Sequence, residues 1–258
     1  MTRVVISQPM FFPWVGLLEQ IRLADVYVHY DDVQFSKGSF ANRVQIKTAK
    51  GPKWLTLPVR VHLGDSIRDV HLSEDDAWRK GHLSFLSQAF EGAPYAHDAL
   101  ELVAKAYARD TNLLNEVVVA SMDVLLAYFE IAPSRILKSS EMGIAGKSWQ
   151  SVLDIVKSVG GDTYITGHGA REYMDHEAFE RAGVAVEYLD YEKRPYPQLN
   201  GEFTPFVSAL DLVANMGRDG RTKIASGTKS WNSLVRLSVA PVSKKGISAG
   251  KGYSMEVR

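Results

Sequence analysis

Short apolar runs alternate with polar or proline-rich loops over the first fifty residues. Residues 4–7 form a β-branched run, residues 8–16 (QPMFFPWVG) are rich in proline and aromatic side chains, and residues 25–35 (DVYVHYDDVQF) begin with a second apolar run. This order predicts a strand, a loop, a helix and a strand, with polar side chains where the strands end. In open α/β sheets, ligands bind at such strand ends.

A β-hairpin is predicted after these two strands. Residues 44–47 and 54–59 are rich in strand-forming side chains and flank a turn that contains Gly51 and Pro52. Residues 67–72 predict a further short strand.

The apolar period becomes helical between residues 75 and about 130. Apolar side chains recur three and four positions apart in three successive stretches, and Gly92-Ala93-Pro94 separates the first two. We therefore predict three helices, which form a helical subdomain between two α/β portions.

Strands and helices alternate again after this subdomain. Residues 135–137, 163–166 and 184–188 predict strands, residues 149–160 predict a helix, and residues 170–183 are expected to contain another helix. Successive βα units imply a parallel sheet with right-handed crossovers. The predicted fold class is α/β, with a mostly parallel Rossmann-like sheet, a helical insertion and a small β-hairpin element.

Length and composition predict one α/β domain over residues 1–243, with its helical subdomain at about 75–130. Of the 258 residues, 45% are hydrophobic, which suffices for a sizeable core. Residues 244–258 are rich in Ser, Gly and Lys and predict a flexible tail. No secretory segment is visible, and no apolar run approaches the roughly 18 residues of a membrane span, so we expect a cytoplasmic protein without membrane insertion.

Charge balance and the lack of cysteine exclude several kinds of function. With 30 basic and 30 acidic residues, the chain lacks the basic excess of nucleic-acid-binding proteins. Without cysteine it has no disulfide, thiolate metal site or cysteine nucleophile. The seven histidines show no metal-ligand spacing, so no metal is expected, and no G-x-S-x-G element of a serine hydrolase occurs. The expected partner is a small-molecule substrate.

Gln8 and Trp14 lie in the loop after the first predicted strand and are candidate substrate-binding residues. A glutamine amide can bind a ligand amide or hydroxyl, and an indole offers a flat face to a ring. The alternative is structural, because Pro9 and Pro13 can set a rigid turn whose aromatic side chains cover the sheet edge.

His29, Asp31 and Asp32 follow the second apolar run, and Asn42 and Arg43 follow later. Strand alternation places His29 and Asp31 on one face and Asp32 on the other. We expect Asp32 to act as a general base and Arg43 to hold a phosphate or carboxylate. His29 is a further catalytic candidate, and Asn42 is a substrate-binding one. A structural ion pair between Asp32 and Arg43 is the alternative.

Two later loops, each before a predicted helix, are candidate anion-binding sites. Lys147 lies in the sequence GKS, preceded by Ser140, and His168 lies in the sequence GHG. Free N–H groups at helix N-termini attract anions. The spacing G-x-x-x-x-G-K-[ST] is absent, so no P-loop is predicted, and plain helix capping is the alternative. Tyr173, shortly after His168, is a candidate substrate-binding residue.

Gln198 stands in the proline-rich sequence RPYPQ, where packing gives little reason for a glutamine. We predict that it donates or accepts a hydrogen bond to substrate. Ser208, with Asp211 three residues later, predicts a capped helix start that needs no ligand. At the C-terminal edge of the sheet, one cleft is expected to be lined by Gln8, Asp32, Arg43 and Gln198.

Taken in order, several of these strings resemble the WbqC-like family. They are Q-P-x-F-x-P-W-x-G, D-V-Y-V-x-Y-D-D-V-Q-F, N-R-V-Q-I-K, W-L-T-L-P-V and Y-P-Q-x-x-x-x-F-x-P-x-V-S-x-L-D-L-x-x-N-x-G, from about Val4 to about Gly217. That family is known mostly by its place among genes for O-antigen and other surface or specialised glycans. The resemblance implies a small-molecule biosynthetic enzyme that transfers an acyl or aminoacyl group to an amino sugar or related amine. It also implies an acyl-CoA or acyl-carrier thioester as donor, with acyl carrier protein as a partner.

Two other functions stay open. A first strand that leads into a proline-rich loop and helix, followed by late βα units, is also typical of class I synthetase-like nucleotidyltransferases, although the His pair of their first loop is missing. The other function is a non-catalytic binding module in a glycan-assembly complex. Convergence of the strand-end polar groups on one pocket would favour an enzyme, and scatter over several faces would favour the module.

Overall fold

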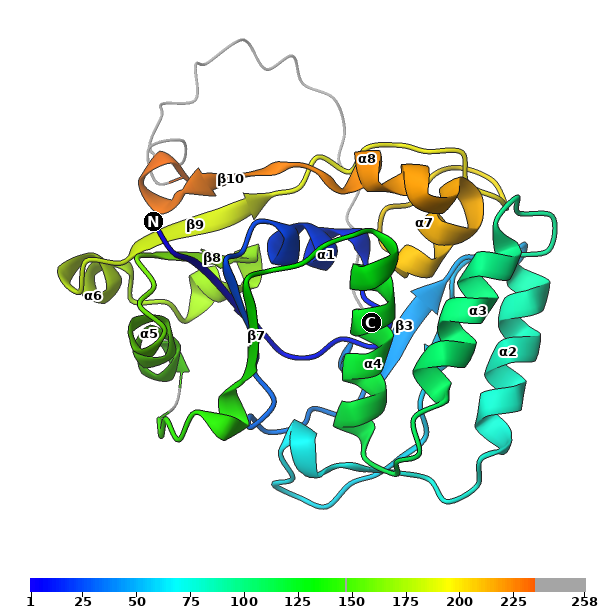
Figure 1. Cartoon of the computed structure of the whole chain (residues 1–258), viewed down its shortest axis with the longest axis horizontal. Helices are drawn as coiled ribbons and strands as arrows, with labels where there is room; N and C mark the ends of the chain where they lie inside the picture. Colours follow the sequence, from blue (N-terminus) through cyan, green and yellow to red (C-terminus); the bar gives the residue numbers. More distant parts are fainter. Residues whose placement is uncertain (147, 235–258) are drawn as a thin grey trace, which may run out of the picture.

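A computed structural model describes residues 1–146 and 148–234. Its main sheet has six strands in the order β10-β9-β8-β1-β2-β7, and all neighbours are parallel except β10 and β9 (Figure 1). The predicted mostly parallel α/β fold is therefore confirmed. The strands are β1 (Arg3–Ser7), β2 (Val26–His29), β7 (Arg135–Lys138), β8 (Thr163–Thr166), β9 (Ala185–Asp190) and β10 (Gly227–Ser230).

Chain connections leave β1 and β8 in opposite directions. From β1 the chain passes through α1 (Val15–Arg22) to β2, whereas from β8 it passes through η3 (His168–Glu172) and α6 (His176–Arg181) to β9. Numbered one to five along the chain, the parallel strands β1, β2, β7, β8 and β9 lie in the order 5-4-1-2-3. Doubly wound nucleotide-binding folds share this order, and they bind ligands where the direction reverses.

Both faces of the sheet are covered by helices, which explains why its strands read as nearly continuous apolar runs. Val5 and Tyr27 point into the larger core cluster with α1 and the helical insertion. Val4 and Val28 point into a second cluster with α6 and with α5 (Ser148–Ser158). Figure 1 shows α5 and α6 together, well apart from the inserted helices.

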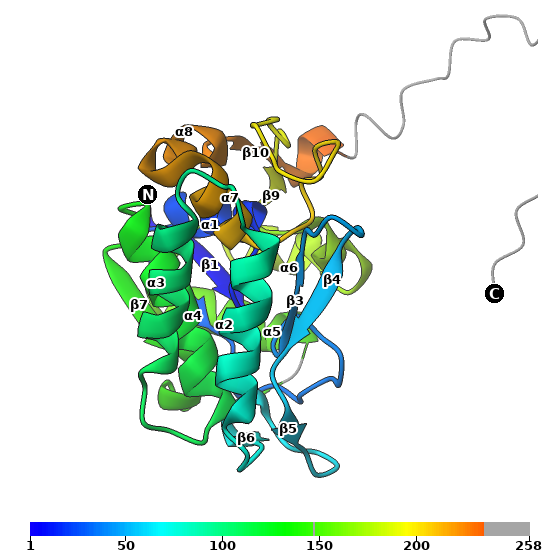
Figure 2. The same ribbon diagram turned by 90° about the vertical axis from the view of Figure 1, so that its right-hand side faces the viewer.

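The insertion between β2 and β7 contains the predicted hairpin and the three predicted helices (Figure 2). The hairpin contacts the first inserted helix, where His82 Nε2 lies 3.1 Å from the Thr56 carbonyl oxygen. The strand predicted at 67–72 is shorter than expected, because residues 67–69 form a 3-10 turn. The elements are β3 (Arg43–Ile46), β4 (Lys53–Thr56), β5 (Val59–Arg60), η1 (Ile67–Asp69), β6 (His71–Leu72), α2 (Ala77–Ala89), α3 (Ala96–Tyr107) and α4 (Leu114–Tyr128).

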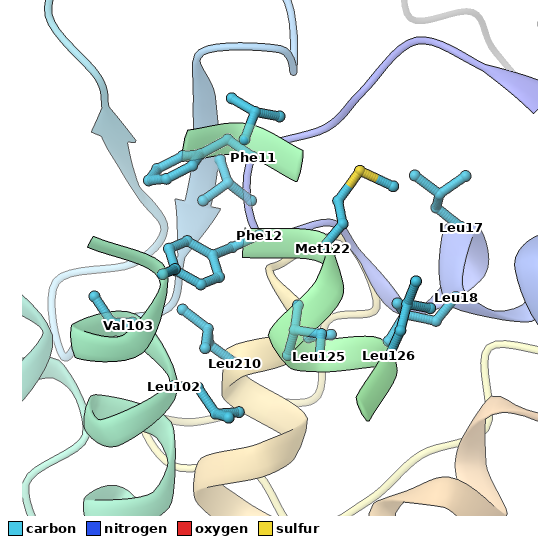
Figure 3. Packing of buried hydrophobic residues seen from close by; sticks show 14 of the residues in the cluster. Phe11, Phe12, Leu17, Leu18, Leu102, Val103, Met122, Leu125, Leu126 and Leu210 are labelled. Carbon is cyan, nitrogen blue, oxygen red and sulfur yellow. The ribbon is translucent and has the colours of Figure 1, made fainter. Parts of the chain in front are cut away.

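Phe11 and Phe12 anchor the loop after β1 in the larger core. Figure 3 shows both rings among side chains of α3, α4 and α7 (Ala209–Met216). The Phe12 N–H donates to Ser121 Oγ at 2.9 Å, and Ser208 Oγ donates to the Phe12 carbonyl at 2.8 Å across 196 positions of sequence. The two phenylalanines of this loop are therefore core residues.

The C-terminal third agrees with its sequence pattern. Residues 170–183, predicted to contain a helix, contain α6, which begins where Asp175 accepts a hydrogen bond from the Ala178 N–H. Ser208 caps α7 as predicted, by accepting from the Leu210 N–H at 3.1 Å. The predicted tail at 244–258 lies outside the described residues. The remaining elements are η2 (Ser139–Glu141), η4 (Gly217–Gly220) and α8 (Arg221–Ile224). Within the described ranges no helix combines the length and apolar character of a membrane span.

Candidate functional site

A cavity of about 790 Å³, here named the switch-point cavity, lies at the carboxyl ends of β1 and β8. Ser7 and Gln8 border it at the end of β1, and residues 166–170 border it at the end of β8. Trp14 and Ser148 add the N-terminal ends of α1 and α5. The cavity therefore stands where the chain direction reverses, the place at which sheets of this type bind ligands.

Neutral polar groups and aromatic rings make up the chemistry of the switch-point cavity. Its hydroxyl and amide groups belong to Ser7, Gln8, Gln20, Tyr30, Ser148, Tyr164, Thr166 and Tyr173, and Trp14 and Phe40 add further rings. Among the described residues, no Asp, Glu, Lys or Arg side chain lines it. Burial raises the pKa of Tyr173, so this phenol is neutral at physiological pH. The lining is suited to a ligand with hydroxyl groups and a ring face.

Gln20 is the most enclosed amide of the cavity. It lies on α1 at 9% exposure, with Gly167 beside its Nε2. Within the described parts of the chain its amide makes no hydrogen bond to protein, so both ends can serve a ligand or water. Sequence reasoning missed this residue, and the available signal was a glutamine in the apolar stretch of a helix.

Trp14 forms a rigid wall of the cavity. Its ring lies against Gly16, where a Cβ would come within 2.2 Å of the indole. Tyr191 packs edge-on against the same ring with centroids 5.3 Å apart, and Trp14 forms a β-bridge with Ser208. The sequence W-x-G is thereby explained, because only glycine leaves room for the indole over the start of α1.

His168 follows β8 on η3 and carries the imidazole of the cavity lining. Its ring stacks on Tyr188 with centroids 5.7 Å apart and an interplanar angle of 21°. The residue is exposed to solvent. An imidazole can act as a general base, so this side chain can take a proton from a bound ligand.

The predicted residues therefore fall into two groups. The structure brings Gln8, Trp14, His168 and Tyr173 together on the switch-point cavity. Its lining does not include Asp32, Arg43, His29, Asn42, Ser140 or Gln198. Lys147 lies outside the described residues, so its predicted role is not placed here.

Asp31 and Asp32 fasten the loop after β2 to the loop after β7. Asp31 is 1% exposed, and its carboxylate accepts hydrogen bonds at 3.0 Å from Asn115 Nδ2, the Ser140 N–H and Ser140 Oγ. Asp32 accepts a hydrogen bond from Ser139 Oγ at 2.5 Å. Both donors of Ser140 are thus directed at a carboxylate, which leaves them unavailable to an anionic ligand in this conformation.

Arg43 and Asn42 belong to the hairpin. The Arg43 guanidinium lies 4.2 Å above the centroid of the Trp54 ring, and Asn42 Nδ2 donates to the Leu57 carbonyl at 3.1 Å. No ion pair between Asp32 and Arg43 is found in the described ranges, so the structural alternative of an ion pair is not realised.

His29 is buried at 1% exposure and packs edge-on against Tyr27 with centroids 4.8 Å apart. Within the described chain neither ring nitrogen has a hydrogen-bond partner. Burial lowers the pKa of His29 to about 4, more than the nearby Asp31 carboxylate raises it, so the ring is neutral at pH 7. The structure thus encloses His29 beside β1, away from the cavity lining.

Gln198 belongs to a buried polar network. Its Oε1 accepts from Lys47 Nζ and from the Thr204 N–H, each at 2.9 Å, while its Nε2 donates to Asp211 Oδ1 at 2.7 Å. Tyr196 donates to the same carboxylate oxygen at 2.8 Å. Burial raises the pKa of Asp211. The packing reason for Gln198 is therefore this network, in which Lys47 comes from 151 positions away in the sequence.

Comparison with known proteins gives the family of the chain. The model of the WbqC-like protein family matches residues 8–223. One relative is the uncharacterized protein Rv1507c of Mycobacterium tuberculosis (strain ATCC 25618 / H37Rv), 30% identical over 226 residues, which cover 85% of this chain and 96% of the relative. No solved structure matches the chain. The chain belongs to the WbqC-like protein family.

Proposed function

We propose that this protein is a transferase of glycan or related specialised metabolism, which transfers an acyl or aminoacyl group to an amino sugar or related amine in the switch-point cavity. Membership of the WbqC-like family supports the general role. The observation that carries the specific proposal is the lining of this cavity, in which amides, hydroxyls and aromatic faces converge without an Asp, Glu, Lys or Arg among the described residues.

A sugar ring matches this lining in two ways. Its hydroxyl groups can exchange hydrogen bonds with Gln8, Gln20 and Thr166, and its apolar ring face can lie on Trp14. Convergence of these groups on one cavity also supports an enzyme over a scaffold, because a scaffold needs no concentration of polar groups in a cavity.

The transfer needs a group that accepts the proton of the amine. It also needs a hydrogen-bond donor to the acyl oxygen. The acceptor amine bonds to the carbonyl carbon of a thioester, the carbon–sulfur bond breaks, and the sulfur leaves with the electron pair. His168 takes the proton of the amine and gives it to the departing thiolate, so the histidine ends the reaction in its starting protonation state. The Gln20 N–H groups are placed in the same cavity and can stabilise the oxyanion.

A ligand screen by thermal shift tests this proposal. The probes are glucosamine, a nucleotide-linked amino sugar, acetyl-CoA and ATP, each measured on wild type and on Gln20→Leu. A ligand at a hundred times its Kd raises stability by about 2.7 kcal/mol. Stabilisation by an amino sugar or thioester that Gln20→Leu weakens is expected. Stabilisation by none of them would contradict the proposal.

Nucleotidyl transfer is the second candidate, and the strand order supports it. The order 5-4-1-2-3 with a cavity at the reversal point is shared with nucleotide-binding folds, although a shared fold does not imply a shared reaction. In the same screen, stabilisation by ATP alone would favour this second function.

A further inference from the structure

A second cavity of about 250 Å³, here named the apolar pocket, adjoins the switch-point cavity. The two share Met10, Trp14 and Phe40. The rest of the wall of the apolar pocket includes Val44 of β3 and the pair Phe206 and Val207 before α7. A single ligand that reaches both cavities would thus touch the shared three side chains.

The apolar pocket differs sharply from its neighbour in chemistry. Gln45 is the one polar side chain among its lining residues, and the others are aliphatic, aromatic or proline. A lining of this kind favours apolar ligands, because their binding removes apolar surface from water. Such a lining cannot satisfy hydroxyl groups, so its occupant must itself be apolar.

The walls of the apolar pocket combine fixed and accessible side chains. Val44 is 4% and Val207 2% exposed, and Trp14 is held by Gly16 and Tyr191. Phe206 and Phe40, by contrast, are 57% and 52% exposed. A ligand that covers these two rings would remove large apolar surfaces from water, which gives the pocket a driving force for binding.

We infer that the apolar pocket binds the apolar chain of a ligand whose polar part lies in the switch-point cavity. At about 30 Å³ for a water-sized group, a volume of 250 Å³ holds roughly eight groups, so the occupant is an acyl or alkyl chain of up to about eight carbon atoms. Phe40 and Phe206 then determine chain-length specificity. The identity of the polar part rests on the proposed function, but the chain site does not.

Straight-chain 1-alkanols from butanol to dodecanol test this site without any sugar or thioester. The chain has seven methionines, and their methyl groups can be observed by NMR after isotopic labelling, with the Met10 signal assigned through Met10→Leu. We expect the Met10 signal to shift saturably. Affinity should rise about fourfold for each added methylene and level off near eight carbons.

Two exposed aromatic residues provide the matched variants. Phe206 lines the apolar pocket but not the switch-point cavity, and Tyr95, which is 41% exposed, lines neither. Phe206→Ala should weaken 1-octanol binding at least about fivefold, Phe206→Leu should restore most of it, and Tyr95→Ala should leave it unchanged.

The outcomes separate this inference from the proposed function. Chain-length-dependent binding that depends on Phe206 supports the chain site even if the protein acylates no amine. An unmoved Met10 signal, affinity independent of chain length, or equal loss in Phe206→Ala and Tyr95→Ala would overturn the inference, whatever reaction the protein catalyses.

Discussion

The indole of Trp14 occupies the space in which a side chain of Gly16 would stand. A Cβ on Gly16 would lie 2.2 Å from Cη2 of Trp14, a separation that real side chains do not reach. Because Trp14 borders both the switch-point cavity and the apolar pocket, this contact gives both cavities their shared wall.

Gly16→Ala should therefore displace Trp14. We expect a loss of about 1 to 3 kcal/mol in the free energy of unfolding, the range for overpacking a well-packed site. Binding of 1-octanol and of an amino sugar should weaken together. Chemical denaturation and titration measure both effects.

Gly81→Ala is the matched control, because an added Cβ there meets no atom within 4 Å. Gly81 lies within α2, so alanine should be neutral or stabilising by up to about 1 kcal/mol. A Gly16→Ala protein as stable as this control, with unchanged ligand affinity, would mean that the Trp14 wall adapts.

Replacement of Gln198 should affect stability rather than ligand binding. Gln198→Ala removes a partner from Lys47 and from Asp211, both buried, and should cost about 2 to 4 kcal/mol. Substrate affinity should be retained in the folded fraction. Gln88 is exposed on α2, so Gln88→Ala is the control. Its free energy of unfolding should stay within about 0.5 kcal/mol of the wild-type value. A Gln198→Ala protein with wild-type stability but without substrate binding would contradict this prediction and support a role for Gln198 in substrate binding.

Loss of the Asp31 carboxylate should destabilise the protein more than loss of the Asp32 carboxylate. Asp31→Asn places an amide donor among the donors of Asn115 and Ser140, and should cost about 2 to 4 kcal/mol. Asp32→Asn disturbs a single hydrogen bond from Ser139 and should cost about 1 kcal/mol. Urea denaturation of both variants checks the order, and a larger loss in Asp32→Asn would contradict it.

Acid should destabilise the protein partly through His29. Its folded pKa of about 4 lies below the unfolded value of 6.5, so the unfolded chain binds more protons between these values. The contribution is complete above pH 6.5 and is lost as the pH falls towards 4, by about 2 to 3 kcal/mol. His29→Phe should reduce the acid loss, while His82, whose pKa burial also lowers to about 4, keeps its own share. Identical pH profiles for wild type and His29→Phe would refute this assignment.

Local patterns predicted the elements well because the strands and helices differ in apolar period. The alternating and continuous apolar runs around Val4, Val26 and Val44 predicted β1, β2 and the hairpin. The strand-end rule singled out Gln8, which lines the switch-point cavity. A helix was predicted within residues 170–183, and the cap formed by Asp175 sets where α6 begins in that region.

The partners of individual polar side chains could not be predicted in the same way. Lys47 and Gln198 are 151 positions apart, and Asp31 and Ser140 are 109 apart, so no local pattern reveals that they satisfy each other. Gln20 was missed for a different reason, which lies in its local sequence. Helical periodicity assigns its neighbours to the core but does not distinguish a buried glutamine that faces a cavity.

The rate of N-acylation of an amino sugar, measured by mass spectrometry on wild type, Gln20→Leu and His168→Ala, tests most directly whether the switch-point cavity performs the proposed transfer. We predict an amide product from wild type, and a fall in kcat of at least about 100-fold in His168→Ala, the scale of losing a general base. Gln20→Leu should also be slowed, because it removes a donor from the cavity. Wild-type rates in both variants, or no amide product with any thioester donor, would contradict the proposed function.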